Sequence, residues 1–420
     1  MVTSSSAQAP GSVVIVGAGM VGLSTAWFLQ DHGIDVTVVD RTGVAAGSSW
    51  GNAGWLAPAL TTPLPEPSVR SYGVKAVVSP SSPVYVPLRP DPRLLRFLLR
   101  FARNCTPARW KQAMGVFGKI GDQALDAYDM LTDGGVAEPT RRAEPFTVGL
   151  GAAKAERGFV EELEHIRAAG IGVDYEVVTG TQARAQEPAF GPGVAAAVRM
   201  QGQRYIDPGR FVQALADSVS ARGGKVMDGV DVTGVRDVGA EGVIVATSSG
   251  DFRADAVVLA NGAWLGELAR PFGVRQIVQA GRGYSFSVPA EHVPANPVYF
   301  PDVRLACTPL GDRLRVGGTM EFRSPDAAFD PRRVSAMIAA GKTRLAGIDW
   351  DDRVDEWVGS RPCTADGLPL VGPPRSPRVH VAGGHGMWGI AWGPFTGRMA
   401  AETLVTGRTP ELIAPFDPLR

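Results

Sequence analysis

The sequence predicts an α/β fold in two structural units, and three observations lead to this prediction. The chain has 420 residues, which is more than one compact core usually holds. A short apolar strand, a glycine-rich turn and a helix follow one another in residues 12–40, as in parallel sheets. Strand patterns alternate with helix patterns in 61–204 and 269–355, which indicates a second, α+β unit with an antiparallel sheet.

The composition is that of a globular protein and excludes several classes. Lys+Arg and Asp+Glu number 42 each, and a net charge of zero argues against nucleic acid as a partner. The three cysteines are far apart and no histidine pair has helical metal-site spacing, so we expect no metal site. We find no apolar run long enough for a transmembrane segment and no secretory signal in the first twelve residues, so we expect a cytoplasmic protein.

The run 12–40 carries the most specific pattern. A β-branched strand ends in Gly17, Gly19 and Gly22, which have the spacing G-x-G-x-x-G. The first glycine permits a tight turn, the second lets a pyrophosphate approach the backbone, and the third lets the helix pack closely on the strand. A helix then runs to Gly33, and a second strand ends at Asp40, whose carboxylate is placed to accept hydrogen bonds from a ribose. The pattern predicts binding of an ADP-containing dinucleotide.

Three features favour FAD over NAD as this dinucleotide. A long Gly/Ala/Ser loop at 41–58 follows the acid, where an NAD domain would have a short connection. The pattern occurs once, because 149–154 and 280–285 do not match it. A strand at 378–384 leads into a helix that we expect to begin with Pro394 at its first position. The N-terminus of such a helix can stabilise negative charge on a reduced flavin.

Two further helices and one strand can be delimited from local signals. The run 207–224 has Asp207 as N-cap, a proline at the first helical position and Gly223 beyond the end. The run 158–170 places its large apolar residues on one face. A buried strand in 254–264 ends at a glycine where backbone can approach a ligand.

The order of these motifs resembles the D-amino-acid oxidase superfamily of flavoproteins, and is most similar to the small-subunit type of D-amino-acid dehydrogenase. The matching stretches are residues 16–41, 48–58, 207–215, 254–264, 281–288, 315–322, 359–372 and 383–398. The resemblance implies a Rossmann-like FAD-binding domain of the glutathione-reductase type with an inserted antiparallel-sheet substrate domain. It assigns 1–60, 205–268 and 356–420 to the FAD-binding domain, and 61–204 and 269–355 to the substrate domain.

The resemblance also implies which residues surround the cofactor. These are Gly17, Gly19, Met20, Val21, Gly22, Asp40, Arg41, Ser48, Asn52, Ala53, Gly54, Trp55, Val232, Asn261, Gly262, Gly384, Gly386, Met387, Trp388, Gly389 and Ile390. Within this set Val232 should lie beside the adenine. For Trp55 and Trp388, a place in the pocket wall and ordinary core packing remain equally open.

Three residues are implied at the substrate. An arginine in a G-x-R-P turn commonly pairs with the substrate carboxylate in this superfamily, and 359–362 fits with Arg361. Its planar fork suits a carboxylate, and Pro362 restricts the backbone before it to extended conformations. Tyr284 is a candidate second carboxylate ligand or an ordinary core aromatic. His385, expected at the flavin edge, either polarises the ring or substrate or has a structural role.

Cys363 raises the question of a covalent flavin. The sarcosine oxidases, which are relatives, hold FAD through a cysteine in this region, several residues before the threonine of a T-x-D segment. Here Cys363 directly precedes Thr364, and the linking position would fall near Gly359. We therefore interpret Cys363 as a small buried packing residue and expect non-covalent FAD.

The resemblance implies FAD-dependent oxidative deamination of an amino acid, with a D-amino acid as the leading substrate class. The Cα hydride passes to flavin N5, and the imino acid hydrolyses to a 2-oxo acid and ammonia. A sarcosine-, glycine- or proline-type oxidase that uses oxygen remains an alternative. So does an electron-transferring or non-catalytic flavoprotein subunit. The amino acid, its stereochemistry, the electron acceptor and the oligomeric state are open.

The run 91–105 predicts a basic amphipathic helix. Its arginines share one face and its leucines and phenylalanines occupy much of the rest. Such a helix can lie on a membrane and bring a flavoprotein to quinones, so peripheral membrane contact and a quinone acceptor are possible. We favour packing of the apolar face on the substrate domain, and an acceptor other than oxygen.

Overall fold

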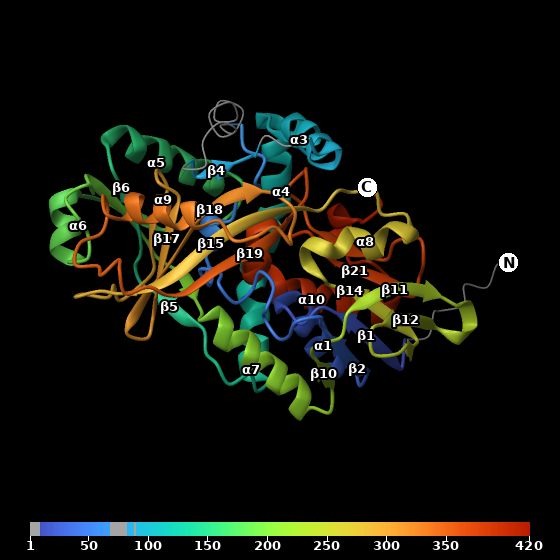
Figure 1. Ribbon diagram of the computed structural model, residues 1–420. Coiled ribbons are helices and arrows are strands. Elements are labelled where there is room, and N and C mark those ends of the chain that lie inside the picture. Colours follow the sequence, from blue (N-terminus) through green and yellow to red (C-terminus); the bar gives the residue numbers. More distant parts are fainter. Residues whose placement is uncertain (1–8, 68–81, 88–89) are drawn as a thin grey trace.

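The computed structural model describes residues 9–67, 82–87 and 90–420. Two large sheets form its two halves, with the helices packed around and between them (Figure 1). Residues 1–8, on which part of the expectation about a leader depends, lie outside the described part of the chain.

The first sheet has six strands in the order β10-β2-β1-β14-β21-β20. Its strands are β1 (Ser12–Val16), β2 (Asp35–Val39), β10 (Lys225–Met227), β14 (Ala256–Leu259), β20 (Leu370–Gly372) and β21 (Val379–Gly383). All neighbours are parallel except β20 and β21. The central strands β1, β14 and β21 are apolar and buried because both faces of the sheet are covered, one by helices and the other mainly by a small three-stranded sheet and a short helix.

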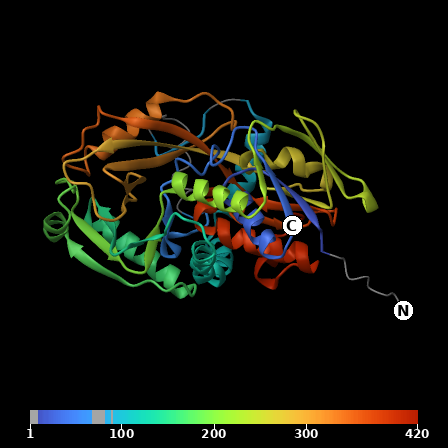
Figure 2. The same ribbon diagram turned by 90° about the horizontal axis from the view of Figure 1, so that it is seen from below.

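Three helices pack beside this sheet. They are α1 (Met20–Asp31), α7 (Pro208–Ala221) and α10 (Gly389–Thr406), and α1 packs against both of the others (Figure 2). The predicted limits of α1 are confirmed by Gly33, which has a φ of +72° just beyond its end. Those of α7 are confirmed by Asp207, whose side chain accepts a hydrogen bond from the Arg210 N–H.

The prediction that Pro394 begins the C-terminal helix is wrong. Helix α10 begins at Gly389, and Pro394 lies inside it. A proline inside a helix leaves the carbonyl four residues earlier without its usual N–H partner. That carbonyl is Ile390 O, which accepts a hydrogen bond of 2.7 Å from the hydroxyl of Tyr128 on α4 (Pro107–Asp133). A residue far away in sequence therefore supplies the missing donor.

The second large sheet is mostly antiparallel and follows the order β19-β15-β18-β17-β16-β6-β8-β7, with β4 beside β18. Its strands are β4 (Val84–Tyr85), β6 (Phe146–Leu150), β7 (Tyr175–Thr179), β8 (Ala196–Met200), β15 (Gln279–Pro289), β16 (Val298–Phe300), β17 (Leu305–Leu310), β18 (Arg313–Phe322) and β19 (Val354–Cys363). Helices α5 (Ala153–Ala168), α6 (Gly180–Gln186) and α9 (Pro331–Gly341) accompany it. The buried residues Phe159, Leu163 and Ile166 confirm the predicted apolar face of α5.

The remaining strands form two small three-stranded sheets. One contains β11 (Val232–Asp237), β12 (Val243–Thr247) and β13 (Phe252–Ala254), and the other β3 (Trp55–Leu56), β5 (Arg141–Ala143) and β9 (Gln203–Tyr205). The six-stranded sheet draws its strands from the three segments assigned to the FAD-binding domain. Strand β19 extends past the proposed boundary at 356 yet belongs to the second large sheet. The division into domains remains a proposal.

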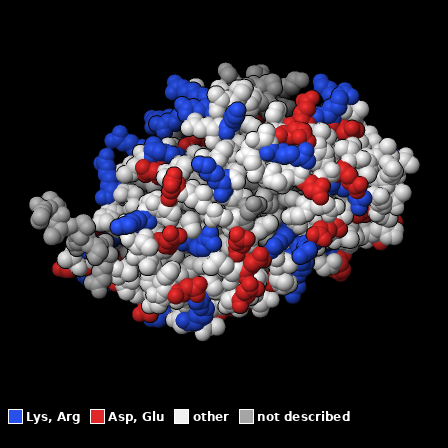
Figure 3. Space-filling view, turned by 180° about the vertical axis from the view of Figure 1, so that it is seen from behind, with Lys and Arg blue, Asp and Glu red and all other residues white. Residues whose placement is uncertain are grey.

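Helix α3 (Pro92–Asn104) packs one face on the molecule and leaves another open. Leu94, Phe97 and Phe101 are buried, as the packing interpretation requires, whereas Leu95 and Leu99 are 59% and 55% exposed. Basic side chains gather at the upper left of Figure 3, toward the end of the molecule where α3 lies. Within the described ranges, no helix is both long and apolar enough to span a membrane.

Candidate functional site

The turn between β1 and α1 requires its glycines for reasons of space and backbone conformation. A Cβ atom on Gly22 would lie 2.0 Å from the carbonyl oxygen of Gly17, and one on Gly17 would lie 2.6 Å from that of Ala260. Gly17 also has a φ of +112°, which side chains strongly disfavour. The turn thus brings the N-terminus of α1 close to the ends of β1 and β14. The first N–H groups of a helix have no partner inside it and attract anions.

Asp40 fixes the loop around this turn. One carboxylate oxygen accepts a hydrogen bond of 2.9 Å from the Ala18 N–H, and the other accepts from Thr42 and Gly43 N–H groups at 2.8 and 3.0 Å. These bonds hold the glycine turn against the loop that follows β2. The predicted contact of Asp40 with a ribose remains a prediction, and this network shows a second reason for an acid at the position.

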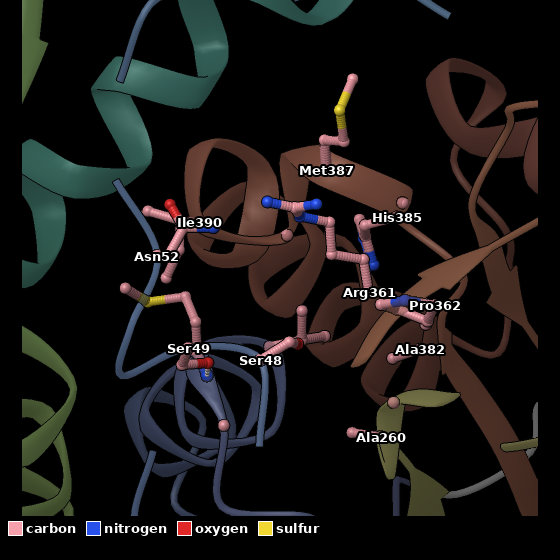
Figure 4. A pocket seen from close by; sticks show the side chains of 17 residues that line it. Ser48, Ser49, Asn52, Ala260, Arg361, Pro362, Ala382, His385, Met387 and Ile390 are labelled. Carbon is pink, nitrogen blue, oxygen red and sulfur yellow. Dashed lines mark hydrogen bonds between the residues drawn. The ribbon is translucent and has the colours of Figure 1, made fainter. Parts of the chain in front are cut away.

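A cavity lies where α1, the 48–52 loop and the ends of β14, β19 and β21 meet, and its empty space, counting the part open to solvent, is about 520 Å³ (Figure 4). It brings together residues from five separated parts of the chain. The predicted site residues that line it are Gly19, Met20, Val21, Ser48, Asn52, Gly262, Arg361, His385, Gly386, Met387, Gly389 and Ile390.

Five residues that line the cavity were not predicted from the sequence. They are Ser49, Ala260, Pro362, Ala382 and Gly383. Ser49 is the informative one, because its buried hydroxyl accepts a hydrogen bond of 3.2 Å from the Met20 N–H at the start of α1. The Ser-Ser pair in the sequence offered a signal for it, although nothing local distinguishes the two serines.

The other predicted cofactor residues lie outside the lining of this cavity. Gly17 and Gly22 belong to the turn between β1 and α1, and Asp40 holds this turn through the Ala18 N–H. Ala53 and Asn261 are adjacent in sequence to lining residues, Gly54 follows Ala53, and Val232 begins β11. Gly384 and Trp388 line a smaller cavity that shares His385, Gly386 and Met387 with the first.

The side chains of Arg41, Trp55 and Trp388 are each held by protein partners. The guanidinium of Arg41 lies 3.8 Å above the ring of Trp264 and 3.2 Å from a carboxylate oxygen of Asp326. Trp55 donates from Nε1 to Thr308 Oγ1 at 2.9 Å and packs on aromatic rings of the second large sheet. Trp388 donates from Nε1 to the Thr62 carbonyl at 2.7 Å. For these three, roles at the cofactor remain predictions.

The residues around the cavity fit a dinucleotide cofactor. The Asn261 Oδ1 atom is buried without a hydrogen-bond partner in the described part of the chain, which is costly unless a ligand supplies a donor. Gly262 and Gly386 have φ values of +58° and +57°, and a Cβ on either would meet no atom within 4 Å. Their open sides leave backbone accessible for a ligand. Gly19, Ser48 and Ser49 can hold a phosphate group at the helix N-terminus.

Arg361 is the only cationic side chain among the lining residues and lies beside His385 (Figure 4). Its Nη1 donates to the Thr319 carbonyl at 2.9 Å. No carboxylate in the described ranges forms an ion pair with it, and burial lowers its pKa. A guanidinium that is largely removed from water and lacks a counter-ion favours binding of an anion.

Tyr284 does not line the cavity. It lies next to Gly283 in β15, and successive side chains of a strand point to opposite faces. Arg361 passes over Gly283, so Tyr284 points away from it. Its buried hydroxyl donates to Glu321 Oε1 at 2.8 Å, and burial, with Glu321 adding to the effect, raises the pKa of Tyr284 to about 12. This arrangement gives no support to the expected contact with a substrate carboxylate.

His385 is buried, and its Nε2 lies 2.8 Å from Thr396 Oγ1 on α10. Burial lowers the pKa of His385 to about 4, so the ring is neutral near pH 7. It can therefore take part in hydrogen bonds at the cavity but supplies no positive charge there. His380 on β21 is also buried, and burial lowers its pKa to about 4.

These two histidines predict acid sensitivity. Both have a pKa lower in the folded than in the unfolded chain, so unfolding takes up protons, and stability present above about pH 6.5 is lost as the pH falls toward 4. Each should contribute a loss of about 2 kcal/mol by about pH 5. Between about pH 7 and about pH 5, the midpoint temperature of unfolding measured by calorimetry should fall less in His380→Val than in the parent protein. His32→Gln is the control, because His32 is exposed, and its midpoint should fall as far as that of the parent. An equal fall in the parent, His380→Val and His32→Gln would show that His380 is not a source of the acid sensitivity.

Cys363 packs in a buried cluster with Phe97, Phe322 and Met320. A Cβ on Gly281 would lie 2.8 Å from its Sγ atom, so the thiol lies against that strand. Burial raises the pKa of Cys363 to about 12, which keeps it a protonated thiol. These observations support the interpretation of Cys363 as a packing residue.

Comparison with known proteins agrees with this geometry. A family model described as DAO, FAD-dependent oxidoreductase, matches residues 12–403. Proteins named D-amino acid dehydrogenase from Cereibacter sphaeroides and Bradyrhizobium diazoefficiens are each 32% identical, over 413 and 410 residues, and the matches cover 95% of this chain and 93% and 96% of theirs.

Two solved structures share the fold. Glycine oxidase from Geobacillus kaustophilus has a TM-score of 0.74 at 22% identity, and the match covers 98% of both chains. L-proline dehydrogenase from P. horikoshii has a TM-score of 0.67 at 17% identity, again over 98% of each chain. At these identities the likeness concerns the fold alone.

Proposed function

The chain belongs to the DAO family of FAD-dependent oxidoreductases, and from that premise we propose that it catalyses the oxidative deamination of a D-amino acid. The relatives named D-amino acid dehydrogenase support the substrate class, since they match nearly the whole chain. The observation that carries the proposal is the guanidinium of Arg361, which has no carboxylate partner in the described ranges and lies in the same cavity as the N-terminus of α1. One cavity thus combines a cofactor-binding turn with a site for a carboxylate.

In this proposal the chain supplies binding and orientation. Gly19, Ser48 and Ser49 hold the pyrophosphate of FAD, and the open faces of Gly262 and Gly386 admit the cofactor close to the backbone. When bound, FAD supplies the two-electron acceptor for the amino acid. Arg361 holds the substrate carboxylate, which fixes the Cα–H bond in place. The amino acid would lose two electrons and two protons, as a hydride from Cα and a proton from nitrogen, and water then converts the imino acid to a 2-oxo acid and ammonia.

The residues that line the cavity favour transfer of the substrate's ammonium proton to water rather than to a side chain of the protein. His385 is neutral, and its Nε2 is engaged with the hydroxyl of Thr396. No Asp or Glu appears among the residues that line the cavity. The substrate ammonium would therefore lose its proton to solvent, and the protein's contribution is orientation and charge compensation through Arg361.

Anaerobic reduction of the purified protein tests this function. A panel of D- and L-amino acids should bleach the flavin absorbance only with D-enantiomers, and product assays should give the 2-oxo acid and ammonia in equal amounts. Bleaching by L-enantiomers or by glycine and its N-methyl derivative alone would contradict the proposed substrate class. No bleaching by any amino acid would favour a non-catalytic flavoprotein.

We further propose that the acceptor is a quinone or another compound that reacts faster than oxygen, and that the protein works in the cytoplasm. The name dehydrogenase in the relatives supports the first point. Reoxidation of the reduced protein by air should then be slow, and reoxidation by a soluble quinone should be fast. Rapid formation of hydrogen peroxide in air would contradict the acceptor assignment.

A further inference from the structure

The guanidinium of Arg361 lies directly on a glycine of the neighbouring strand. A Cβ atom on Gly283 would lie 2.2 Å from both Cζ and Nη2 of Arg361 and 2.3 Å from Nη1. Gly283 does not have a positive φ, so backbone conformation alone would admit an alanine there. The absence of a side chain at Gly283 therefore provides space for one group, the planar end of Arg361.

The second contact of the guanidinium comes from an irregular point in β18. Arg282 faces Glu321 and Tyr284 faces Gly318, so one residue of β15 is opposite two residues of β18. This is a β-bulge, and Thr319 within it has a φ of +53°, a strained value for a β-branched residue. The Thr319 carbonyl accepts the hydrogen bond from Arg361 Nη1. The strained backbone of Thr319 contacts Arg361, a residue that lines the cavity, and such strain at a site points to a functional constraint.

Buried polar groups on the other face of the sheet fix the register of this bulge. Arg282 and Glu321 are cross-strand partners, and they form an ion pair of 2.9 Å with side chains 1% and 0% exposed. The Tyr284 hydroxyl donates to the same carboxylate oxygen at 2.8 Å. A slip of one residue between β15 and β18 would separate these buried groups, so the pairing that creates the bulge is strongly specified.

We infer that Gly283 and the Thr319 carbonyl are positioning elements that hold the Arg361 fork flat against β15, so that its remaining N–H groups face the substrate carboxylate. This inference rests on the proposed role of Arg361 and assigns the orientation of that arginine to two residues outside the cavity lining. A side chain at Gly283 lifts the fork from the sheet and breaks its bond to Thr319. The effect on folding is small, because only the flexible end of an arginine must move.

A double-mutant cycle tests the inference. Gly283→Ala should retain the flavin content and unfolding midpoint of the parent protein, whereas kcat/KM falls about 10- to 100-fold for the D-amino acid that bleaches the flavin fastest. In an Arg361→Ala background the same substitution should change kcat/KM by less than about 2-fold, since the group it displaces is gone. The amide of the same amino acid, which lacks the carboxylate, should be oxidised about equally by parent and Gly283→Ala.

Gly317→Ala on β18 is the matched control. A Cβ there would meet its nearest atom, Ser285 Cβ, at an ordinary 3.6 Å, so kcat/KM should stay at the parent value. Three results would overturn the inference: an unchanged kcat/KM in Gly283→Ala, an equal loss in both backgrounds, or failure of Gly283→Ala to fold with flavin. Failure of the proposed function is seen separately, as a parent flavin that no D-amino acid bleaches, whereas full activity of Arg361→Ala would remove the role of Arg361 and overturn the inference.

Discussion

Arg361→Ala should lower kcat/KM for the amino acid substrate by about 30- to 4,000-fold, which corresponds to about 2–5 kcal/mol of transition-state stabilisation. The reason is the loss of a charge-assisted contact to the carboxylate in a site that offers no other cation among its lining residues. The substrate's negative charge would then be removed from water without compensation. Steady-state kinetics with an artificial acceptor gives this value.

The specificity of the effect is the decisive part of this prediction. An amine without a carboxylate should be oxidised nearly as well by Arg361→Ala as by the parent, and Arg361→Lys should recover only part of the activity, because an ammonium cannot reproduce the planar fork. Arg142→Ala is a suitable control, since the Arg142 side chain is 77% exposed on β5. If acid and amine lose activity equally, Arg361 has a role other than carboxylate binding.

Gly22→Ala should abolish FAD binding or prevent folding. The added Cβ would lie 2.0 Å from the carbonyl oxygen of Gly17 and 3.1 Å from its carbonyl carbon, and neither backbone atom can move without displacing α1 or β1. Overpacking of this kind costs about 1–3 kcal/mol or more, and here it also distorts the turn that receives the cofactor. The measurement is flavin content per chain after acid precipitation, together with the unfolding midpoint.

The same measurement tests how the cofactor is held. In the parent protein, acid should release all of the flavin into the supernatant, because Cys363 is a buried thiol. Flavin that stays with the precipitate would contradict non-covalent binding. Gly115→Ala on α4 is the matched control for Gly22→Ala, since both glycines are helical but a Cβ on Gly115 would meet no atom within 4 Å. Flavin content at the parent level in Gly22→Ala would contradict the argument from space.

Much of the fold follows from short stretches of sequence. The β-branched runs of β1 and β14 are buried strands, Asp207 and Gly33 delimit α7 and α1, and the apolar face of α5 is the one its spacing predicts. These signals are local, because they depend on backbone preferences and on the period of the element itself. The glycine pattern near the N-terminus and, through the family resemblance, the motif around Arg361 also predicted residues that line the cavity.

Other features depended on contacts between distant segments. Pro394 is tolerated inside α10 because Tyr128, on another helix, donates to Ile390 O. Ser49 is a lining residue because its loop returns to the start of α1. The face on which Tyr284 lies is set by the pairing of β15 with β18 and β19, and a shift of one residue would reverse it.

The sequence by itself determined the glycine turn, the limits of α1 and α7 and the buried strands, and the family resemblance singled out Arg361 as the candidate ligand of an anion. Only the tertiary structure decided that Arg361 rests on Gly283, that Thr319 is strained beside it, and that Tyr284 points to the opposite face. The physical reason is the range of the forces involved. Backbone propensity and capping act within a few residues, whereas strand register and steric fit are settled when elements far apart in the chain pack together.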